Sequence, residues 1–170
     1  MVDAGIAAVF FALLAWAAWE DVRTFRIPNW LVGALFALFV LAFAAGTIDR
    51  NQWPGHFSAG IAALACGMAL FARNWIGGGD AKLFAVLALW TGWPDTLRLL
   101  AVTALAGGAV SAFVLLRFRY SAKKKESASA TAEERAREPK VPYGVAIATA
   151  GLDFWSRILA ASFLFPSIHL

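Results

Sequence analysis

The chain has 170 residues and a net charge of +4, with 61% hydrophobic and 15% charged residues and a mean hydropathy of +0.66. A soluble domain cannot bury that much apolar surface, so the composition excludes a soluble globular enzyme and indicates a polytopic membrane protein. The positive charge does not indicate nucleic-acid binding, because the basic residues are grouped by side of the membrane rather than over one face.

Apolar runs of about 20 residues predict six transmembrane helices and an all-α fold. In chain order the runs lie near 4–20, 29–48, 57–73, 75–93, 97–116 and 142–165. They leave almost nothing over, so residues 1–170 are expected to form a single integral-membrane domain. The first run lacks a positively charged segment before it, so it is expected to stay in the mature protein rather than act as a cleaved signal peptide.

Two of these runs carry small residues at four-residue spacing, which allows neighbouring helices to approach closely. The small residues are Ala59, Ala63 and Gly67 on the third run and Ala104, Gly108 and Ala112 on the fifth. They favour a compact bundle, and an alanine-rich helix without a special interface is the alternative.

The distribution of Lys and Arg predicts the topology. With the N-terminus outside, most basic residues lie in three cytoplasmic connections, and the stretch at about 117–140 between the fifth and sixth spans is expected to be a charged cytoplasmic linker. Tryptophans prefer membrane interfaces. On this topology Trp19, Trp30 and Trp75 mark the inner interface, and Trp53, Trp90 and Trp93 mark the outer one.

Two carboxylates stand out against this apolar background. Asp80 follows three glycines, Gly77 to Gly79, about five residues into the fourth run, and Asp21 ends the first run on the same cytoplasmic side. An isolated Asp at the centre of a spanning helix costs roughly 2.5–3.5 kcal/mol on insertion scales, so such a residue is a functional hypothesis by default. If the first and fourth helices pack together, the two groups face each other and share a proton.

A pair of carboxylates that shares a proton is the arrangement of aspartic proteases. The ionised member takes a proton from water, and the neutral member stabilises the oxyanion and protonates the leaving amine. Glycines let a substrate backbone come close and let the chain leave helical geometry. The structural alternative is that Asp80 is the N-cap of a helix starting at Ala81 and that Asp21 is an interfacial residue near Arg23.

Two other acids compete for a functional role. Glu20 adjoins Asp21, but neighbours in a helix point about 100° apart, so one of them at most faces the bundle interior. Asp153 lies near the middle of the sixth run, and Arg157 follows it at the i+4 position. That spacing predicts a structural ion pair within the membrane.

No metal or cofactor is expected. Cys66 is the single cysteine and lies in the middle of the third run, so neither a disulfide nor a Cys-x-x-Cys zinc site can be built. His56 and His169 fall at the outer edge, far from both aspartates.

Three blocks of the sequence resemble the type IV prepilin peptidases in order and topology. The blocks are Asp21-Val22-Arg23 with Ile27-Pro28-Asn29, then Gly77 through Leu83, then Pro142 through Ala148. This family consists of membrane aspartic proteases of the Gly-x-Gly-Asp type. The resemblance implies that Asp21 and Asp80 form the catalytic pair and that no metal takes part.

The same resemblance implies the substrate and the place of action. Prepilin and pseudopilin precursors would lose their short leader peptide at the cytoplasmic face of the inner membrane, after a glycine that precedes the hydrophobic segment. Gly77, Gly78, Gly79, Lys82 and Arg23 match supporting positions. For Lys82 and Arg23, substrate binding, tuning of the aspartates and anchoring in lipid headgroups remain open. The block of Pro142, Tyr143 and Gly144 has no assigned role.

The chain looks like the short form that accompanies tight-adherence (Flp) pilus systems. Larger bacterial enzymes carry an additional cytoplasmic segment with paired Cys-x-x-Cys motifs and methylate the new N-terminus, so cleavage without N-methylation is expected here. The alternatives are an archaeal preflagellin-type peptidase and a non-enzymatic transporter or channel subunit that uses buried acids, which Asp153 would favour. The expected partners are the precursors and the lipid bilayer; nucleic acid is not expected, and a homo-oligomer is left open.

Overall fold

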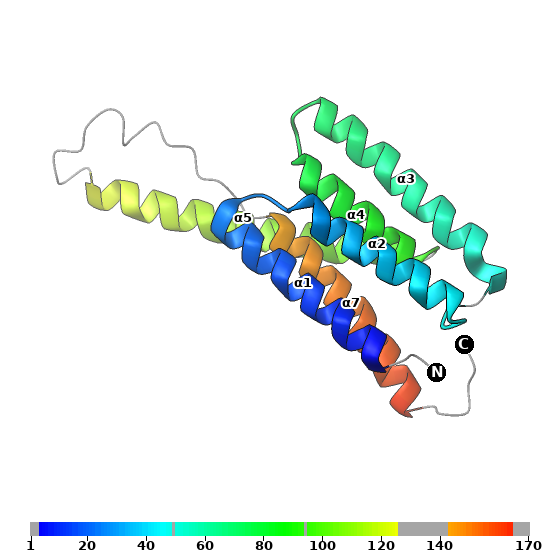
Figure 1. The fold of residues 1–170 in the computed structure, drawn as a ribbon. Coiled ribbons are helices and arrows are strands. Elements are labelled where there is room, and N and C mark those ends of the chain that lie inside the picture. Colours follow the sequence, from blue (N-terminus) through cyan, green and yellow to red (C-terminus); the bar gives the residue numbers. More distant parts are fainter. Residues whose placement is uncertain (1–3, 49, 94, 126–142, 165–170) are drawn as a thin grey trace.

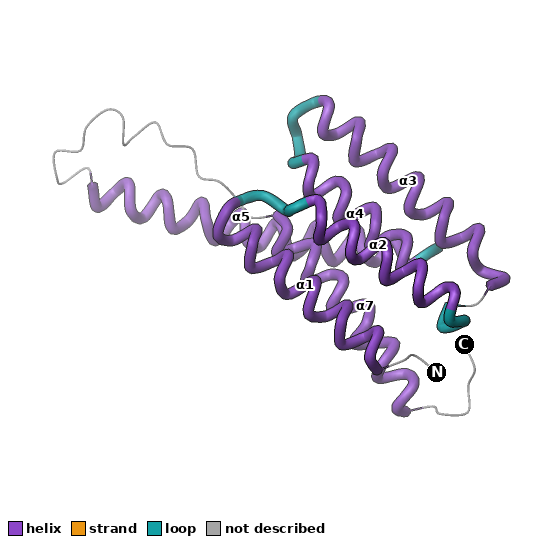
Figure 2. Tube along the Cα trace, viewed as in Figure 1, coloured by secondary structure: helices purple, strands orange, loops and turns teal. Residues whose placement is uncertain are grey.

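The structure, a computed structural model, describes residues 4–48, 50–93, 95–125 and 143–164 (Figure 1). Within these ranges all regular structure is helical (Figure 2). The elements are α1 (Ala4–Thr24), α2 (Asn29–Ala44), the short 3-10 helix η1 (Arg50–Gln52), α3 (Trp53–Ala72), α4 (Gly78–Thr91), α5 (Asp95–Lys125) and α7 (Tyr143–Leu164). The all-α fold is therefore as expected, and the described residues contain six α-helices, the number of apolar runs.

The α-helices among the described residues differ in length and hydropathy, which decide whether a helix can cross a membrane. Three are long and apolar enough, over Gly5–Thr24, Trp53–Ala72 and Asp95–Arg117. Shorter apolar stretches occupy Asn29–Ala44 and Tyr143–Phe154. The helix α4 has 14 residues, which at 1.5 Å per residue is about 21 Å, less than the roughly 30 Å of hydrocarbon. Of the six expected transmembrane helices, three are thus candidates for crossing a membrane by length and composition.

The short helix α4 forms the centre of the bundle, where it packs against α2, α3, α5 and α7. Its buried side chains point in all directions around the helix: Ala81, Leu83, Ala85, Leu87, Ala88, Leu89, Trp90 and Thr91. A helix that is apolar all round is stable when neighbours cover it on every side. This position brings the residues at the start of α4 into contact with several helix ends.

Small residues let α3 lie close to α4. The buried residues of α3 are Ala59, Gly60, Ala63 and Gly67. A Cβ added to Gly67 would lie 3.0 Å from the Cβ of Ala81, so a larger residue there would push the helices apart. The predicted close approach is confirmed for this helix.

The corresponding prediction for the fifth run is wrong. The small residues Ala104, Gly108 and Ala112 are exposed, and no atom lies within 4 Å of a Cβ built on Gly108. The helix α5 instead turns Gly107 toward α7, where an added Cβ would lie 3.6 Å from the Cβ of Ala146 and 3.6 Å from Cδ1 of Tyr143. Sequence spacing alone does not select which face of a helix is covered.

Trp90 belongs to the core rather than to the outer interface, which corrects the sequence prediction. Trp90 is 4% exposed. Its ring packs edge-on against the rings of Phe10 and Phe39, with ring centroids 4.9 Å and 5.5 Å apart. The indole N–H donates a hydrogen bond to the carbonyl oxygen of Leu35 over 3.1 Å, which satisfies its polar group. The other tryptophans assigned to interfaces are exposed: Trp19, Trp30, Trp53, Trp75 and Trp93.

The helices α1 and α7 lie side by side and antiparallel, as the blue and orange ribbons of Figure 1 show. The helix α5 continues to Lys125, so the first part of the expected linker at about 117–140 is helical. The remainder of that linker lies outside the described residues.

Candidate active site

Asp21 is buried because it continues the apolar stripe of α1. The inward-facing residues of this helix follow a three-and-four spacing: Ala7, Phe10, Leu14, Ala17 and Asp21. The side chain of Asp21 is 4% exposed, whereas Glu20 is half-buried. The prediction that one of these two neighbouring acids faces the interior is confirmed, and the acid is Asp21.

The chain turns sharply just after Asp21. Phe25 has a φ of 52°, and its N–H donates a hydrogen bond to the carbonyl oxygen of Asp21 over 2.9 Å. Positive φ is uncommon for a bulky residue and ends the helix abruptly. The turn places Ile27, which is 8% exposed, beneath the start of α4.

Asp80 is the third residue of α4, because this helix starts at Gly78 with Gly77 as its N-cap. Both sequence placements are therefore corrected: Asp80 lies neither about five residues into a longer helix nor at the N-cap of a helix from Ala81. Its carboxylate turns back toward the N–H of Gly77. Acidic residues at this position of a capping box do the same, and the helix dipole stabilises their charge.

The three glycines before Asp80 differ in what a side chain would meet. A Cβ on Gly77 would lie 2.8 Å from Oδ2 of Asp80, and one on Gly79 would lie 3.1 Å from the Cβ of Ile27 and 3.3 Å from its carbonyl oxygen. A Cβ on Gly78 would meet the ring of Phe71 at 3.2 Å. A ring on a side chain can move aside, but backbone and the candidate carboxylate cannot without cost. A side chain should therefore be tolerated better at position 78 than at position 77 or 79.

The structure brings the two aspartates together at one end of the bundle. Their carboxylates lie close enough to repel each other when both are charged. Oδ2 of Asp21 is buried and has no hydrogen-bond partner. Among the described residues, neither carboxylate forms an ion pair that would offset this repulsion.

The two basic residues proposed as supporting groups lie apart from the carboxylates. Nζ of Lys82 donates a hydrogen bond to Oδ1 of Asn29 over 3.0 Å. The guanidinium of Arg23 lies 5.6 Å from the ring centre of Trp19, on the exposed side of α1. Asn29 stood in a sequence block without a role of its own; the structure shows that it anchors Lys82.

An apolar groove leads to Asp80. It has a volume of about 300 Å³ and lies among α3, α4, α5 and α7. Its walls include Cys66 and Gly67 of α3 and Leu100 of α5, and Phe84 of α4 lies between them. Among the lining residues that the structure describes, Asp80 carries the one charge. An extended or helical apolar segment in this groove would end beside a carboxylate.

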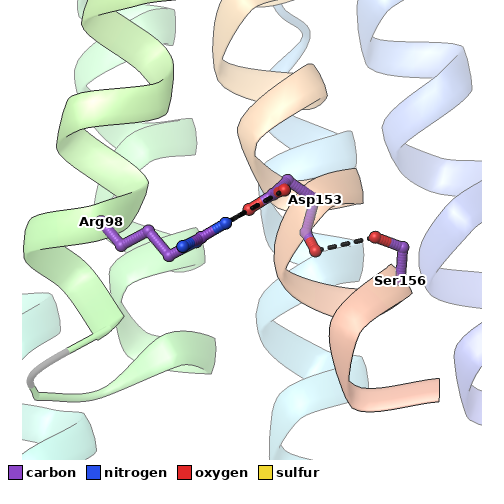
Figure 3. Close-up of polar contacts among 3 residues, drawn as sticks. All are labelled: Arg98, Asp153 and Ser156. Carbon is purple, nitrogen blue, oxygen red and sulfur yellow. Dashed lines mark hydrogen bonds and ion pairs between the residues drawn. The ribbon is translucent and has the colours of Figure 1, made fainter. Parts of the chain in front are cut away.

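Asp153 lies away from this site and has a different partner from the one expected. It pairs with Arg98 of α5, whose Nε lies 3.1 Å from its Oδ2 (Figure 3). Ser156 donates a hydrogen bond to the carbonyl oxygen of Asp153 over 2.9 Å. The predicted pairing with Arg157 is wrong, because packing of α5 against α7 brings a more distant cation closer.

Histidine and cysteine form no metal site in the part of the chain that the structure describes. Nδ1 of His56 lies 2.8 Å from the carbonyl oxygen of Leu89, so this ring is engaged with the backbone of α4. Cys66 is exposed in the groove, and His169 lies outside the described residues.

One of three comparisons with known proteins found a match. The model of the type IV leader peptidase family matches residues 8–112. The match includes Asp21 and the segment from Gly77 to Asp80, and it ends before α7. No match was found among curated proteins or among solved structures. Because the family match spans more than half of the sequence, the chain belongs to the type IV leader peptidase family.

Proposed function

We propose that the chain is an aspartic endopeptidase that removes the leader peptide from type IV (Flp-like) prepilins and pseudopilins. Asp21 and Asp80 are the catalytic residues in this proposal. The observation that carries it is the approach of two carboxylates from α1 and α4 at one end of the bundle. Membership in a leader peptidase family supports the same reaction.

Two carboxylates close enough to repel each other are most stable when they share one proton, because a second negative charge beside the first is unfavourable. The ionised carboxylate removes a proton from water while the water oxygen attacks the peptide carbonyl carbon. The protonated carboxyl group donates a hydrogen bond to the oxyanion. A proton then passes to the amide nitrogen, the C–N bond breaks, and a carboxylic acid and an amine leave.

The apolar groove supports a substrate with a hydrophobic segment beside the cleavage site. Such a segment would lie between α3 and α5, in contact with Gly67 and Leu100, and its end would reach Asp80. Small residues on the α3 wall permit close approach of another helix. Lys82 is not among the residues that line the groove, and its hydrogen bond to Asn29 of α2 supports α4 rather than the substrate in this arrangement.

The proposed orientation places the site toward the cytoplasm of the inner membrane, with the N-terminus outside. Arg23 and Lys82 lie near the ends of α1 and α4 that carry the aspartates, and Arg73 directly follows α3 in the connection that leads to α4. Positive residues favour the cytoplasmic side, which supports this orientation.

Cleavage without N-methylation is part of the proposal. The connection between α1 and α2 has four residues, Phe25 to Pro28, which offers no room there for a domain that binds a methyl donor. Mass spectrometry of pilin matured by this enzyme, in a host without another prepilin peptidase, should find an unmodified N-terminal amine. A mass gain of one methyl group would contradict this part of the proposal.

The decisive experiment removes each carboxylate without changing its shape. Asp21→Asn and Asp80→Asn should each abolish conversion of a co-expressed prepilin to its mature form, read by gel mobility, because Asn cannot exchange a proton. Glu20→Gln is the matched control and should process normally. Processing at near the normal rate by either Asn variant would remove that residue from the mechanism. Co-expression with a preflagellin instead tests the archaeal alternative.

The transporter alternative loses its main support. It rested on Asp153 as an intramembrane acid available to a transported ion, and this carboxylate is engaged by Arg98. Ion flux that depends on Asp21 or Asp80 in the absence of any precursor would revive it.

A further inference from the structure

The contact between α1 and α7 repeats after seven residues in each helix. Gly151 of α7 lies against Leu14 of α1, and Gly144 lies against Asp21. Because the helices are antiparallel, moving two turns along one corresponds to moving two turns back along the other. The two glycines therefore occupy equivalent positions, one facing an apolar side chain and one facing the buried carboxylate.

The atoms that a side chain would meet differ at these two glycines. A Cβ on Gly144 would lie 2.8 Å from both Cγ and Oδ2 of Asp21 and 2.9 Å from its Cβ. A Cβ on Gly151 would lie 2.8 Å from Cδ1 of Leu14. Carbon atoms in contact are ordinarily about 3.5–4.0 Å apart, so a methyl group at position 144 must displace the carboxylate or the helix by about 1 Å. At position 151 the end of a leucine side chain can rotate instead.

Gly144 also lies in the first turn of α7, where backbone N–H groups are free to bind a carboxylate. This helix begins at Tyr143, so the N–H groups of Gly144 and Val145 belong to its first turn and have no partner within the helix. Both amides approach the carboxylate of Asp21. The positive end of the helix dipole points in the same direction. Oδ2 of Asp21 is buried without a hydrogen-bond partner, and a Cβ built on Gly144 would lie 2.8 Å from it, so the start of α7 lies directly against this oxygen.

We propose that Gly144 is a positioning residue for Asp21. Lacking a side chain, it lets the first turn of α7 lie directly against the carboxylate, which holds the carboxylate opposite Asp80 and turns two backbone amides toward it. The proposal rests on the catalytic role proposed above for Asp21. It extends the functional part of the chain to α7, beyond the residues 8–112 that match the family.

The test compares Gly144→Ala with Gly151→Ala in the full chain, purified in detergent and assayed with a prepilin substrate. Gly144→Ala should lower kcat by about 100-fold, as a 1 Å misplacement of a catalytic group does, and should leave KM within about threefold. Gly151→Ala should keep kcat within about threefold of the normal value. Thermal unfolding should show that both variants remain folded at the assay temperature, so that a difference in kcat reports the position of Asp21 and not loss of the fold.

Equal values of kcat for the two variants would overturn the proposal and leave Gly144 a packing residue. If Gly144→Ala does not fold, Val145→Pro gives a second test: it removes one of the two amides at a place in the first turn where no intrahelical hydrogen bond is lost. A tenfold or greater loss of kcat is expected there, and an unchanged kcat would also overturn the proposal. Failure of the proposed function would differ from both, since the unmodified protein would then not cleave prepilin, or Asp21→Asn would cleave it at the normal rate.

Discussion

Nζ of Lys82 and Oδ1 of Asn29 lie 3.0 Å apart and join the first turn of α4 to the start of α2. Lys82 follows Asp80 by two residues, so this hydrogen bond fixes the end of the helix that carries the candidate carboxylate. We therefore expect the lysine to act on the proposed site through the position of α4 and not through contact with the aspartates.

We expect Lys82→Met and Asn29→Ala to slow cleavage by similar factors, of about three- to tenfold, because each removes the same hydrogen bond, worth about 1 kcal/mol. The double variant should be no slower than the single ones, which a double-mutant cycle of cleavage rates measures. Arg23→Met is the matched control, because Arg23 contacts Trp19 rather than α2. Additive losses in the double variant would show that Lys82 acts independently of Asn29.

The three glycines before Asp80 should differ in their tolerance of a methyl group. Gly78→Ala should retain most activity, because the ring of Phe71 can move. Gly79→Ala should lose activity and stability, because its methyl group meets the backbone of Ile27; overpacking of this kind costs about 1–3 kcal/mol. Gly77→Ala should lower kcat more than stability, because its methyl group meets Oδ2 of Asp80. Cleavage rates and melting temperatures of the three variants measure these differences in tolerance. A Gly78→Ala variant as impaired as Gly79→Ala would contradict the prediction.

The pairing of Asp21 with Asp80 could be predicted from sequence because ionisable residues are rare within apolar runs, and two of them fell at the same side of the predicted membrane. The length of α4 could not be predicted in this way. The apolar run begins at Trp75, but the chain turns at Asn74, where φ is 57°, and Gly77 caps the helix. Hydropathy contains no information about backbone dihedral angles or helix caps, so it could not predict where α4 begins.

Contacts between residues far apart in the chain could not be predicted from the sequence for a different reason. The partner of Asp153 lies 55 residues away and depends on the register between α5 and α7, whereas the i+4 rule considers one helix alone. Trp90 has the composition of an interface residue, and its burial depends on the aromatic rings of Phe10 and Phe39 around it. Gly144 stood in a block without a role because its neighbour, Asp21, lies at the other end of the chain.

The groove can be probed with the native cysteine. Cys66 is exposed on the α3 wall, so reaction with a bulky maleimide should block cleavage if the substrate lies there. Cys66→Ala should cleave normally and resist the reagent. In that background Met68→Cys, on the exposed face of α3, should react without loss of activity. Full activity of the protein modified at Cys66 would exclude the groove as the substrate path.

The orientation of the bundle can be tested with single cysteines in the Cys66→Ala background. Arg73→Cys, at the end of α3 near the aspartates, should react only with reagents that reach the cytoplasm. Gln52→Cys, before the opposite end of α3, should react in intact cells from the outside. Labelling of position 73 from outside would invert the orientation and place the aspartates on the wrong face for leader cleavage.

The ion pair of Arg98 with Asp153 should contribute to stability and not to catalysis. It ties α5 to α7 at a distance from the aspartates, with 49% of the Arg98 side chain and 34% of the Asp153 side chain exposed. Exposed pairs contribute about 0.2–1 kcal/mol, and a charge left without a partner in an apolar environment costs more.

Asp153→Leu and Arg98→Leu should therefore each lower the melting temperature in a bilayer mimic, and the double variant should recover most of the loss because it leaves no lone charge. Cleavage rates should stay within about twofold of normal in all three, since the pair positions neither carboxylate. Arg157→Leu is the matched control: it removes the cation predicted from the i+4 spacing, and it should leave the melting temperature unchanged because Asp153 is paired elsewhere. A melting temperature that falls with Arg157→Leu but not with Arg98→Leu would restore the pairing within α7, and would mean that α5 and α7 are held together by their apolar contacts alone.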